Sequence, residues 1–326
     1  MIKTRVTEKL GIKYPIVCGA MSFITRPEMV AAIANAGGIG FLPSAWYGTP
    51  EKLREAIRQT KELTDKPFGV NINYFPSTKP LPTMEFVEVI VEEKVKAVES
   101  AGHRDPGEIA PRLHEGGVVL IHKSATVRHA LKAEEVGADI VTIVGMENGG
   151  ATGMEDVGTI VLLPALTSKA KIPVLGGGGF ADGRGLIAAL ALGAEGIVMG
   201  TRFMATKECP IHDNYKQRIL NATERDTYLM MRSINNTHRM IKNKYGDKIR
   251  ELEARGATLE ELLPYISGEK SREAAEGGDL EAGYLLGGEA VGLIHDIPTT
   301  KELIERIMAE AESIYNRLGG IGFRAR

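Results

Sequence analysis

The chain has 326 residues, 43% of them apolar, and its 40 Lys and Arg nearly balance its 42 Asp and Glu, which gives a formal net charge of -2. This balance excludes a whole-chain field that would attract nucleic acid or an anionic membrane, so any anion must be bound locally. The two cysteines, Cys18 and Cys209, are too few for a disulfide scaffold and lack CxxC metal spacing.

The amino-terminal residues, MIKTRVTEKLGIKYP, lack the apolar core of a signal peptide, and no stretch reaches the roughly eighteen apolar residues of a membrane-spanning helix. We therefore expect a cytoplasmic protein that is neither exported nor membrane-embedded and that binds no nucleic acid. Small molecules are the expected partners, and association into a homo-oligomer is left open.

Short apolar runs alternate with helical patterns from residue 14 onward. The expected strands are residues 14–21, 39–45, 67–75, 95–100, 118–125, 138–145, 172–179 and 194–203. Helices are expected to begin after Thr25, Thr49 and Thr299, each of which can cap a helix. Eight strand-then-helix units with near-continuous apolar strands predict an α/β protein, a (β/α)8 TIM barrel, with a doubly wound sheet as the rival.

The pattern changes after about residue 212, where YKQRILNATERDTYLMMRSI, KNKYGDKIRELEARG and LEELLPYISG all suggest helices. We therefore expect a smaller helical cap domain over residues 216–289. The barrel is expected to comprise residues 1–215 and 290–326, with the final helical pattern packing back as its eighth helix.

Four successive glycines, Gly176 to Gly179, lie at the end of the seventh expected strand. They match a dinucleotide fingerprint poorly, and glycines that merely relieve crowding at a strand-to-helix turn remain an alternative. We favour a phosphate site, in which bare amides and the amino terminus of the following helix bind an anion. Gly200 and Thr201 end the eighth strand, and the loops after strands seven and eight commonly hold phosphate in such barrels.

Polar or small residues end the other strands, as a flat polar ring lying on backbone requires. They are Gly19, Ala20, Met21, Asn71, His122, Lys123, Glu147 and Asn148. Asn71 can bond an imide edge, and Lys123 can place positive charge near an anionic flavin.

Other candidates receive structural interpretations. His122 is expected to bond a neighbouring segment, and Cys18 to pack in the core. The other histidines, His103, His114, His129, His212, His238 and His295, show no metal-ligand spacing, so no metal is expected. Met230 and Met231 are interpreted as hydrophobic residues of a cap helix.

Five motifs, PIVCGAM, FGVNIN, IHKSATVRHALKAE, GGGGFADGRGLIAALALGA and MGTRFMATKECPIH, resemble the FMN-dependent nitronate monooxygenase family, formerly called 2-nitropropane dioxygenases. The likeness runs over nearly the whole chain. Within the family, FPSTKPLP and HKSATVRHALKAE look most like the branch described as NADH:quinone reductases.

The resemblance implies non-covalent FMN in a (β/α)8 barrel. The cofactor-binding residues it implies, together with the strand ends above, are Gly19, Ala20, Met21, Asn71, Lys123, Glu147, Gly150, Gly177, Gly178, Gly179, Gly200 and Thr201. A loop with Pro76, Pro80 and Pro82 would border the nicotinamide of NADH or NADPH. Family members commonly carry a histidine where this chain has Ala151, which leaves the catalytic residue unknown.

We expect an FMN-dependent oxidoreductase that uses NAD(P)H to reduce its flavin and passes the electrons to a quinone-like acceptor. Two further enzyme activities remain open, the oxidation of alkyl nitronates with O2 and the reduction of enoyl thioesters. A barrel that binds flavin or another phosphorylated ligand without turnover is the remaining alternative. The missing histidine disfavours reactions that need proton transfer at the substrate carbon.

Overall fold

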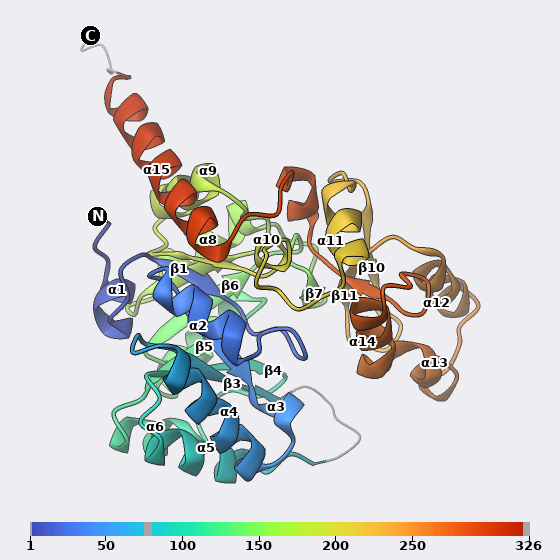
Figure 1. Cartoon of the computed structure of the whole chain (residues 1–326), viewed down its shortest axis with the longest axis horizontal. Coiled ribbons are helices and arrows are strands. Elements are labelled where there is room, and N and C mark those ends of the chain that lie inside the picture. The colour runs from blue at the N-terminus through green and yellow to red at the C-terminus, as the bar shows by residue number, and fades with distance from the viewer. Residues whose placement is uncertain (1, 75–79, 322–326) are drawn as a thin grey trace.

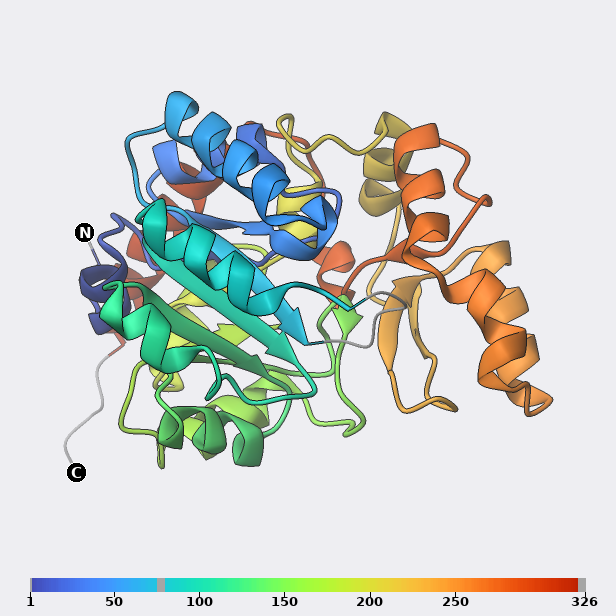
Figure 2. The ribbon, with the colours of Figure 1, turned by 90° about the horizontal axis from the view of Figure 1, so that it is seen from below.

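A computed structural model describes residues 2–74 and 80–321, and within it eight parallel strands close into a barrel (Figures 1 and 2). The strands are β1 (Ile16–Cys18), β2 (Ile39–Pro43), β3 (Gly69–Tyr74), β4 (Ala97–Gly102), β5 (Val119–Ser124), β6 (Ile140–Val144), β8 (Val174–Gly177) and β9 (Ile197–Met199). Each lies within or largely overlaps its expected range, so the predicted (β/α)8 barrel is confirmed.

Helices cover the outside of the barrel (Figure 2). They are α2 (Pro27–Asn35), α4 (Pro50–Leu63), α5 (Thr83–Glu92), α6 (Ala110–Glu115), α7 (Val127–Glu135), α8 (Thr159–Thr167), α9 (Gly183–Ala191) and α15 (Thr300–Gly319). The same part of the chain also contains three short helices, α1 (Arg5–Leu10), α3 (Ser44–Tyr47) and α10 (Thr201–Met204).

Helix α15 packs against α9 and α2 and so closes the ring as its eighth helix. The contact with α9 is close, because a Cβ added at Gly183 would lie 2.6 Å from the backbone nitrogen of Ala311.

Two of the three expected helix caps are confirmed. The Thr49 and Thr299 side chains accept hydrogen bonds from Lys52 and Glu302 amides at the starts of α4 and α15. The cap expected at Thr25 is wrong, because α2 begins after Arg26 without a side-chain cap. The buried Thr25 hydroxyl instead bonds the backbone of Met21, at 3.1 Å from its nitrogen, and fixes the loop after β1.

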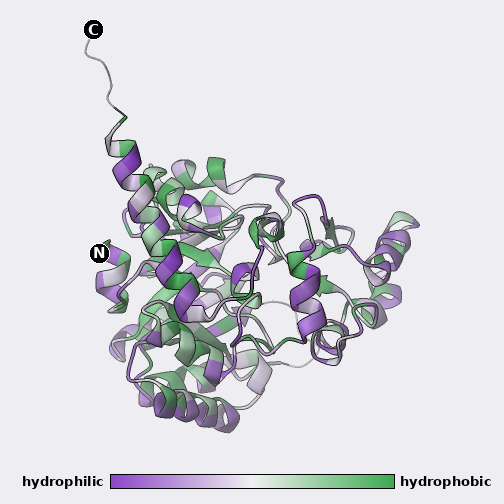
Figure 3. Cartoon of the chain, turned by 45° about the horizontal axis from the view of Figure 1, so that its top comes forward, coloured by the Kyte–Doolittle hydropathy of each residue, from purple (hydrophilic) through white to green (hydrophobic). Residues whose placement is uncertain are grey.

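The barrel strands are largely apolar (Figure 3). One cluster of buried side chains joins Val17, Phe41 and Leu175 to Val6 and Leu10 of α1, which therefore belongs to the same core as the barrel interior. Every one of these five side chains is almost fully excluded from solvent. The apolar strands thus stabilise the closed sheet by burial on both faces.

The segment between α10 and α15 carries both helices and strands, so the expectation of helices alone is wrong. Its elements are α11 (Asp213–Leu220), β10 (Thr227–Met230), β11 (His238–Ile241), α12 (Lys244–Ala254), α13 (Leu259–Ile266), α14 (Gly268–Gly277), β12 (Leu285–Leu286) and the 3-10 helix η1 (Glu289–Leu293). The domain division at residues 216 and 289 stays a prediction.

The unexpected sheet forms because β11 has partners on both sides. It pairs antiparallel with β10 and β12, and also with β7 (Gly150–Ala151), which follows barrel strand β6. Met230 therefore lies in a strand, and Met231 follows it with a φ of 62°. Pairing between segments so far apart in the chain leaves no local periodicity to recognise.

Among the described residues, no helix is both long and apolar enough to cross a membrane.

Candidate functional site

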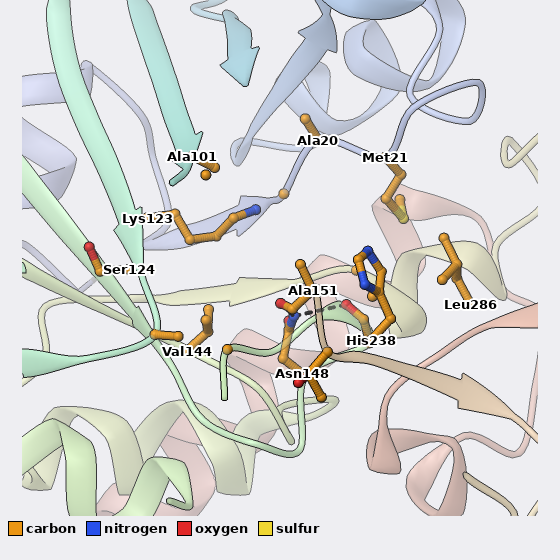
Figure 4. A pocket seen from close by; sticks show the side chains of 18 of the residues that line it. Ala20, Met21, Ala101, Lys123, Ser124, Val144, Asn148, Ala151, His238 and Leu286 are labelled. Carbon is orange, nitrogen blue, oxygen red and sulfur yellow. Dashed lines mark hydrogen bonds between the residues drawn. The ribbon is translucent and has the colours of Figure 1, made fainter. Parts of the chain in front are cut away.

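A cavity of about 1110 Å³ lies between the carboxyl ends of the barrel strands and the small sheet (Figure 4). Seven of the predicted site residues line it, namely Gly19, Ala20, Met21, Lys123, Gly150, Gly200 and Thr201. Seven others within the described ranges are not among its lining residues, namely Asn71, Glu147, Gly177, Gly178, Gly179, Pro80 and Pro82. Pro76 lies outside the described residues.

Lys123 points into the cavity, as Figure 4 shows. Its positive charge is balanced by a carboxylate of the adjacent strand. Its Nζ lies 3.3 Å from Oε1 of Glu99, whose side chain is 1% exposed. The Asn71 amide donates to the same carboxylate oxygen at 3.1 Å and to the Glu99 carbonyl at 3.0 Å. Asn71 is thus bound to Glu99 inside the barrel and supports the site from beneath.

Glu99 is the functional residue that the sequence analysis missed in the barrel. A charged residue within the apolar strand VKAVES was the available signal, because a carboxylate is rarely buried without a partner. We expected an anion beside Lys123 to come from the cofactor, and the structure places one from the neighbouring strand.

His122 also faces this region and is held by the barrel. Its Nδ1 lies 2.9 Å from the Ser100 hydroxyl of the adjacent strand, and burial lowers the pKa of His122 to about 4. The imidazole is therefore neutral near pH 7, in keeping with the structural role expected for it. Ser124, two residues along β5, is among the lining residues, and its hydroxyl is buried with no hydrogen-bond partner among the described residues.

Cys18 lies in the core, as expected. Its side chain is fully buried, and burial raises the pKa of its thiol well above the ordinary value. The thiol is thus protonated and inert near neutral pH.

The glycine loop after β8 presents bare backbone. Gly178 and Gly179 adopt φ values of +95° and +78°, which other residues rarely adopt. Within the described chain, no acceptor binds the amides of Gly178, Gly179 or Gly200, and all three residues are only partly buried. These free donors at the ends of β8 and β9 fit a phosphate group.

Gly177 has a packing explanation. A Cβ at this position would lie 2.7 Å from Cγ1 of Val144, so the glycine lets β8 lie close to β6.

The amino terminus of α9 is already occupied, so the expected contribution of this helix end to anion binding is wrong. The Asp182 carboxylate accepts the amides of Arg184 and Gly185 at 2.9 and 3.1 Å. The remaining first-turn amide, that of Gly183, donates to Glu310 of α15 at 2.8 Å. A phosphate would therefore meet the loop amides alone.

The loop after β6 is fixed by Glu147. Its carboxylate accepts the Thr159 amide and hydroxyl at 3.0 Å, at the start of α8. The Asn148 amide donates to the carbonyl of Ala151 at 3.0 Å, as the dashed line in Figure 4 shows. Both side chains stabilise the loop, and the Glu147 carboxylate is committed to Thr159 instead of the cofactor.

Backbone contacts join this loop to the segment after β12. A Cβ at Gly149 would lie 2.6 Å from the nitrogen of Gly288 and 2.7 Å from the carbonyl carbon of Gly287. The Gly288 amide donates to the Thr201 hydroxyl at 2.9 Å. Glycines at these positions therefore let two loops and the end of β9 meet at one point.

Three histidines that the sequence analysis set aside also line the cavity, namely His103, His129 and His238. His238 lies directly opposite Ala151 in the pairing of β11 with β7. The chain around His238 gave no local signal, because the residue enters the site only through this strand pairing. No group of three or more His, Cys, Asp and Glu side chains among the described residues is placed to hold a metal ion.

The comparison with known proteins agrees with this geometry. The nitronate monooxygenase family matches residues 3–310 of the chain. A probable nitronate monooxygenase from Staphylococcus saprophyticus is 30% identical, over 97% of this chain and 99% of that protein. This agrees with the resemblance found in the sequence motifs.

Two further relatives carry other names. A (3aS,4S,5R,7aS)-5-hydroxy-7a-methyl-1-oxo-octahydro-1H-indene-4-carboxyl-CoA dehydrogenase from Rhodococcus jostii is 34% identical, over 98% of this chain and 99% of that protein. The solved structure of FabK from Thermotoga maritima is 37% identical over 98% of this chain and 99% of that one, with a TM-score of 0.91. The chain is therefore a flavin-dependent oxidoreductase that belongs to the nitronate monooxygenase family.

Proposed function

We propose that the protein binds FMN and uses NADH or NADPH to reduce an organic acceptor in the same cavity. The observation that carries this proposal is the size of the cavity. Its volume of about 1110 Å³ exceeds the roughly 300 to 1000 Å³ of a usual small-molecule site, which leaves room for a second ligand beside a flavin.

FMN, when bound, supplies hydride chemistry, and the residues of the chain supply position and charge. Gly178, Gly179 and Gly200 offer free amides for its phosphate. Lys123 presents its ammonium group to the cavity while Glu99 holds the side chain in place.

A quinone is the acceptor that the sequence resemblance favours. The partly apolar wall formed by Met21, Ala101, Val144 and Leu286 suits a flat, weakly polar ring.

An enoyl thioester is the second candidate, and the relative named as a carboxyl-CoA dehydrogenase favours it. Arg104 and Lys132 line the exposed edge of the cavity and offer donors to the phosphates of a CoA thioester or of NAD(P)H. Oxidation of nitronates, the activity in the family name, is the third candidate and is disfavoured by the alanine at position 151.

The test is anaerobic mixing of the purified protein with NADH and, separately, NADPH in a stopped-flow spectrometer. We expect FMN as the released cofactor and rapid bleaching of its absorbance by at least one nucleotide. Menadione, crotonyl-CoA, ethyl nitronate and ferricyanide are then compared as acceptors.

Failure of both nucleotides to bleach the flavin would remove NAD(P)H from the proposal. Efficient turnover of ethyl nitronate with O2, together with slow reduction by both nucleotides, would make the protein a nitronate monooxygenase. Release of FAD, or of no flavin, would contradict the cofactor assignment.

A further inference from the structure

His238 is the imidazole that the sheet places beside Ala151. It begins strand β11, and the register pairs it with Ala151 of β7. Figure 4 shows its ring next to Ala151 and Met21 at the cavity. A side chain at position 151 and the ring of His238 therefore reach the same part of the site from adjacent strands.

A hydrogen bond fixes the proton on the ring. Nδ1 lies 2.7 Å from the carbonyl oxygen of Asn236, which can only accept, so Nδ1 carries a hydrogen. This is the sole hydrogen bond that the ring of His238 makes with the described residues. In the neutral ring Nε2 therefore holds a lone pair, and it is free to exchange a proton with a bound molecule.

The surroundings keep the resting ring neutral. Burial lowers the pKa of His238 and outweighs the hydrogen bond to the Asn236 carbonyl, which raises it, and His103 lowers it further. A histidine with a lowered pKa is a stronger acid once protonated, which suits rapid release of a proton to a substrate.

Three other titratable groups of the site are committed to protein partners. Glu147 accepts from Thr159, Lys123 is paired with Glu99, and Nδ1 of His122 bonds Ser100. His103 also lines the cavity and is the competing candidate.

We propose that His238 is the catalytic residue that exchanges a proton with the acceptor, from the strand opposite Ala151. The proposal rests on the proposed function as a reductase of organic acceptors. A bound, reduced cofactor would supply the hydride, and the acceptor takes its proton from Nε2 of His238. The ring, neutral at rest, first takes up a proton from water at Nε2. The N–H bond of this imidazolium then breaks, its electron pair stays on Nε2, and the ring returns to its neutral form.

The test separates proton transfer from electron transfer. The FMN protein is reduced anaerobically with dithionite and mixed with menadione, which takes up protons as it is reduced, or with ferricyanide, which accepts electrons alone. We expect His238→Asn to slow reoxidation by menadione about 100-fold and to leave reoxidation by ferricyanide within about twofold. Because no nucleotide is used, the result does not depend on whether NAD(P)H is the reductant.

Rescue tests the position of the imidazole. The variant His238→Ala should show the same loss with menadione. Adding Ala151→His to that variant should raise its rate of reoxidation by menadione at least tenfold. A control variant, His295→Asn, removes an exposed imidazole outside the cavity and should leave both rates unchanged. Independently, 15N NMR of labelled histidines should show His238 protonated at Nδ1.

Three outcomes would overturn the proposal. Equal rates for His238→Asn and the unaltered protein, or equal slowing with both acceptors, would show that His238 transfers no proton. A menadione-specific loss in His103→Asn but not in His238→Asn would assign the role to His103. Finding the His238 proton on Nε2 would contradict the geometry on which the proposal stands.

Discussion

The two walls of the cavity are built by different means. The barrel wall uses buried polar side chains, with Glu99 joining Asn71 to Lys123 across three adjacent strands. The opposite wall uses close backbone contact, in which Gly149 lies against Gly287 and Gly288. The comparison teaches that charge and hydrogen bonding hold the first wall, whereas the second depends on the absence of side chains.

The stability of the barrel wall should depend most strongly on the Glu99 carboxylate. Glu99→Gln leaves the Lys123 ammonium, 23% exposed, without a counter-charge, and we expect the free energy of unfolding to fall by about 3 kcal/mol. Chemical denaturation measures this.

Removing both charges, with Glu99→Gln and Lys123→Met together, should recover part of the loss. The surface pair of Glu88 and Arg112 provides a control, because Glu88→Gln should cost less than about 1 kcal/mol. A loss at Glu99 no larger than this control would show that charge does not hold the barrel wall.

The same wall should make stability depend on pH through His122. Its pKa is about 4 in the folded protein and 6.5 in the unfolded chain, so only the unfolded chain takes up the proton between these values. Stability is full above pH 6.5 and falls on acidification, by about 2 kcal/mol between pH 6.5 and 4.5.

His122→Asn should flatten that slope in denaturation curves measured at several pH values. The loss of the Ser100 hydrogen bond lowers stability at every pH, so the slope is the quantity to compare. An unchanged slope would mean that His122 titrates normally.

The opposite wall should fail when a methyl group is added. Gly149→Ala would place Cβ within 2.7 Å of the backbone of Gly287 and Gly288, which cannot move aside as a side chain would. We expect about 2 kcal/mol of destabilisation in thermal unfolding, and slower turnover because β7 is displaced.

Gly268→Ala is the matched control, since nothing lies within 4 Å of a Cβ there. It should retain full stability. If Gly149→Ala behaves like this control, the close contact between the two loops is not needed.

The glycine loop after β8, which contains Gly178 and Gly179, should lose affinity for FMN when a single methyl group is added. Gly179→Ala adds a methyl group beside a free amide at a φ of +78°, and we expect about tenfold weaker FMN binding, measured by fluorescence on release. Gly117→Ala, at a φ of +69° with open space around it, carries the same backbone cost far from the site. Equal FMN occupancy in the two variants would leave Gly179 with a turn-forming role alone.

The smallest expected effect concerns the proline loop. Pro80 and Pro82 precede α5, and Pro82 has a φ of -78°. Replacing both by Ala should raise KM for the nucleotide about twofold to fivefold, because the loop loses restriction before binding, and should leave KM for the acceptor unchanged. An unchanged nucleotide KM would place the reductant elsewhere.

Local pattern in the sequence determined the barrel and much of the glycine loop after β8. Apolar runs of strand length, the caps at Thr49 and Thr299, and the glycines at 178 and 179 each follow from interactions within a few residues. Such features are visible in the sequence because their causes are local.

Tertiary structure alone decided the rest. The partner of Lys123 proved to be Glu99 on the next strand, and the amino terminus of α9 proved to be closed by Asp182 and Glu310. His238 reached the site because β11 pairs with β7, a segment more than eighty residues earlier in the chain. These contacts join residues that share no periodicity, so only the folded chain brings them together.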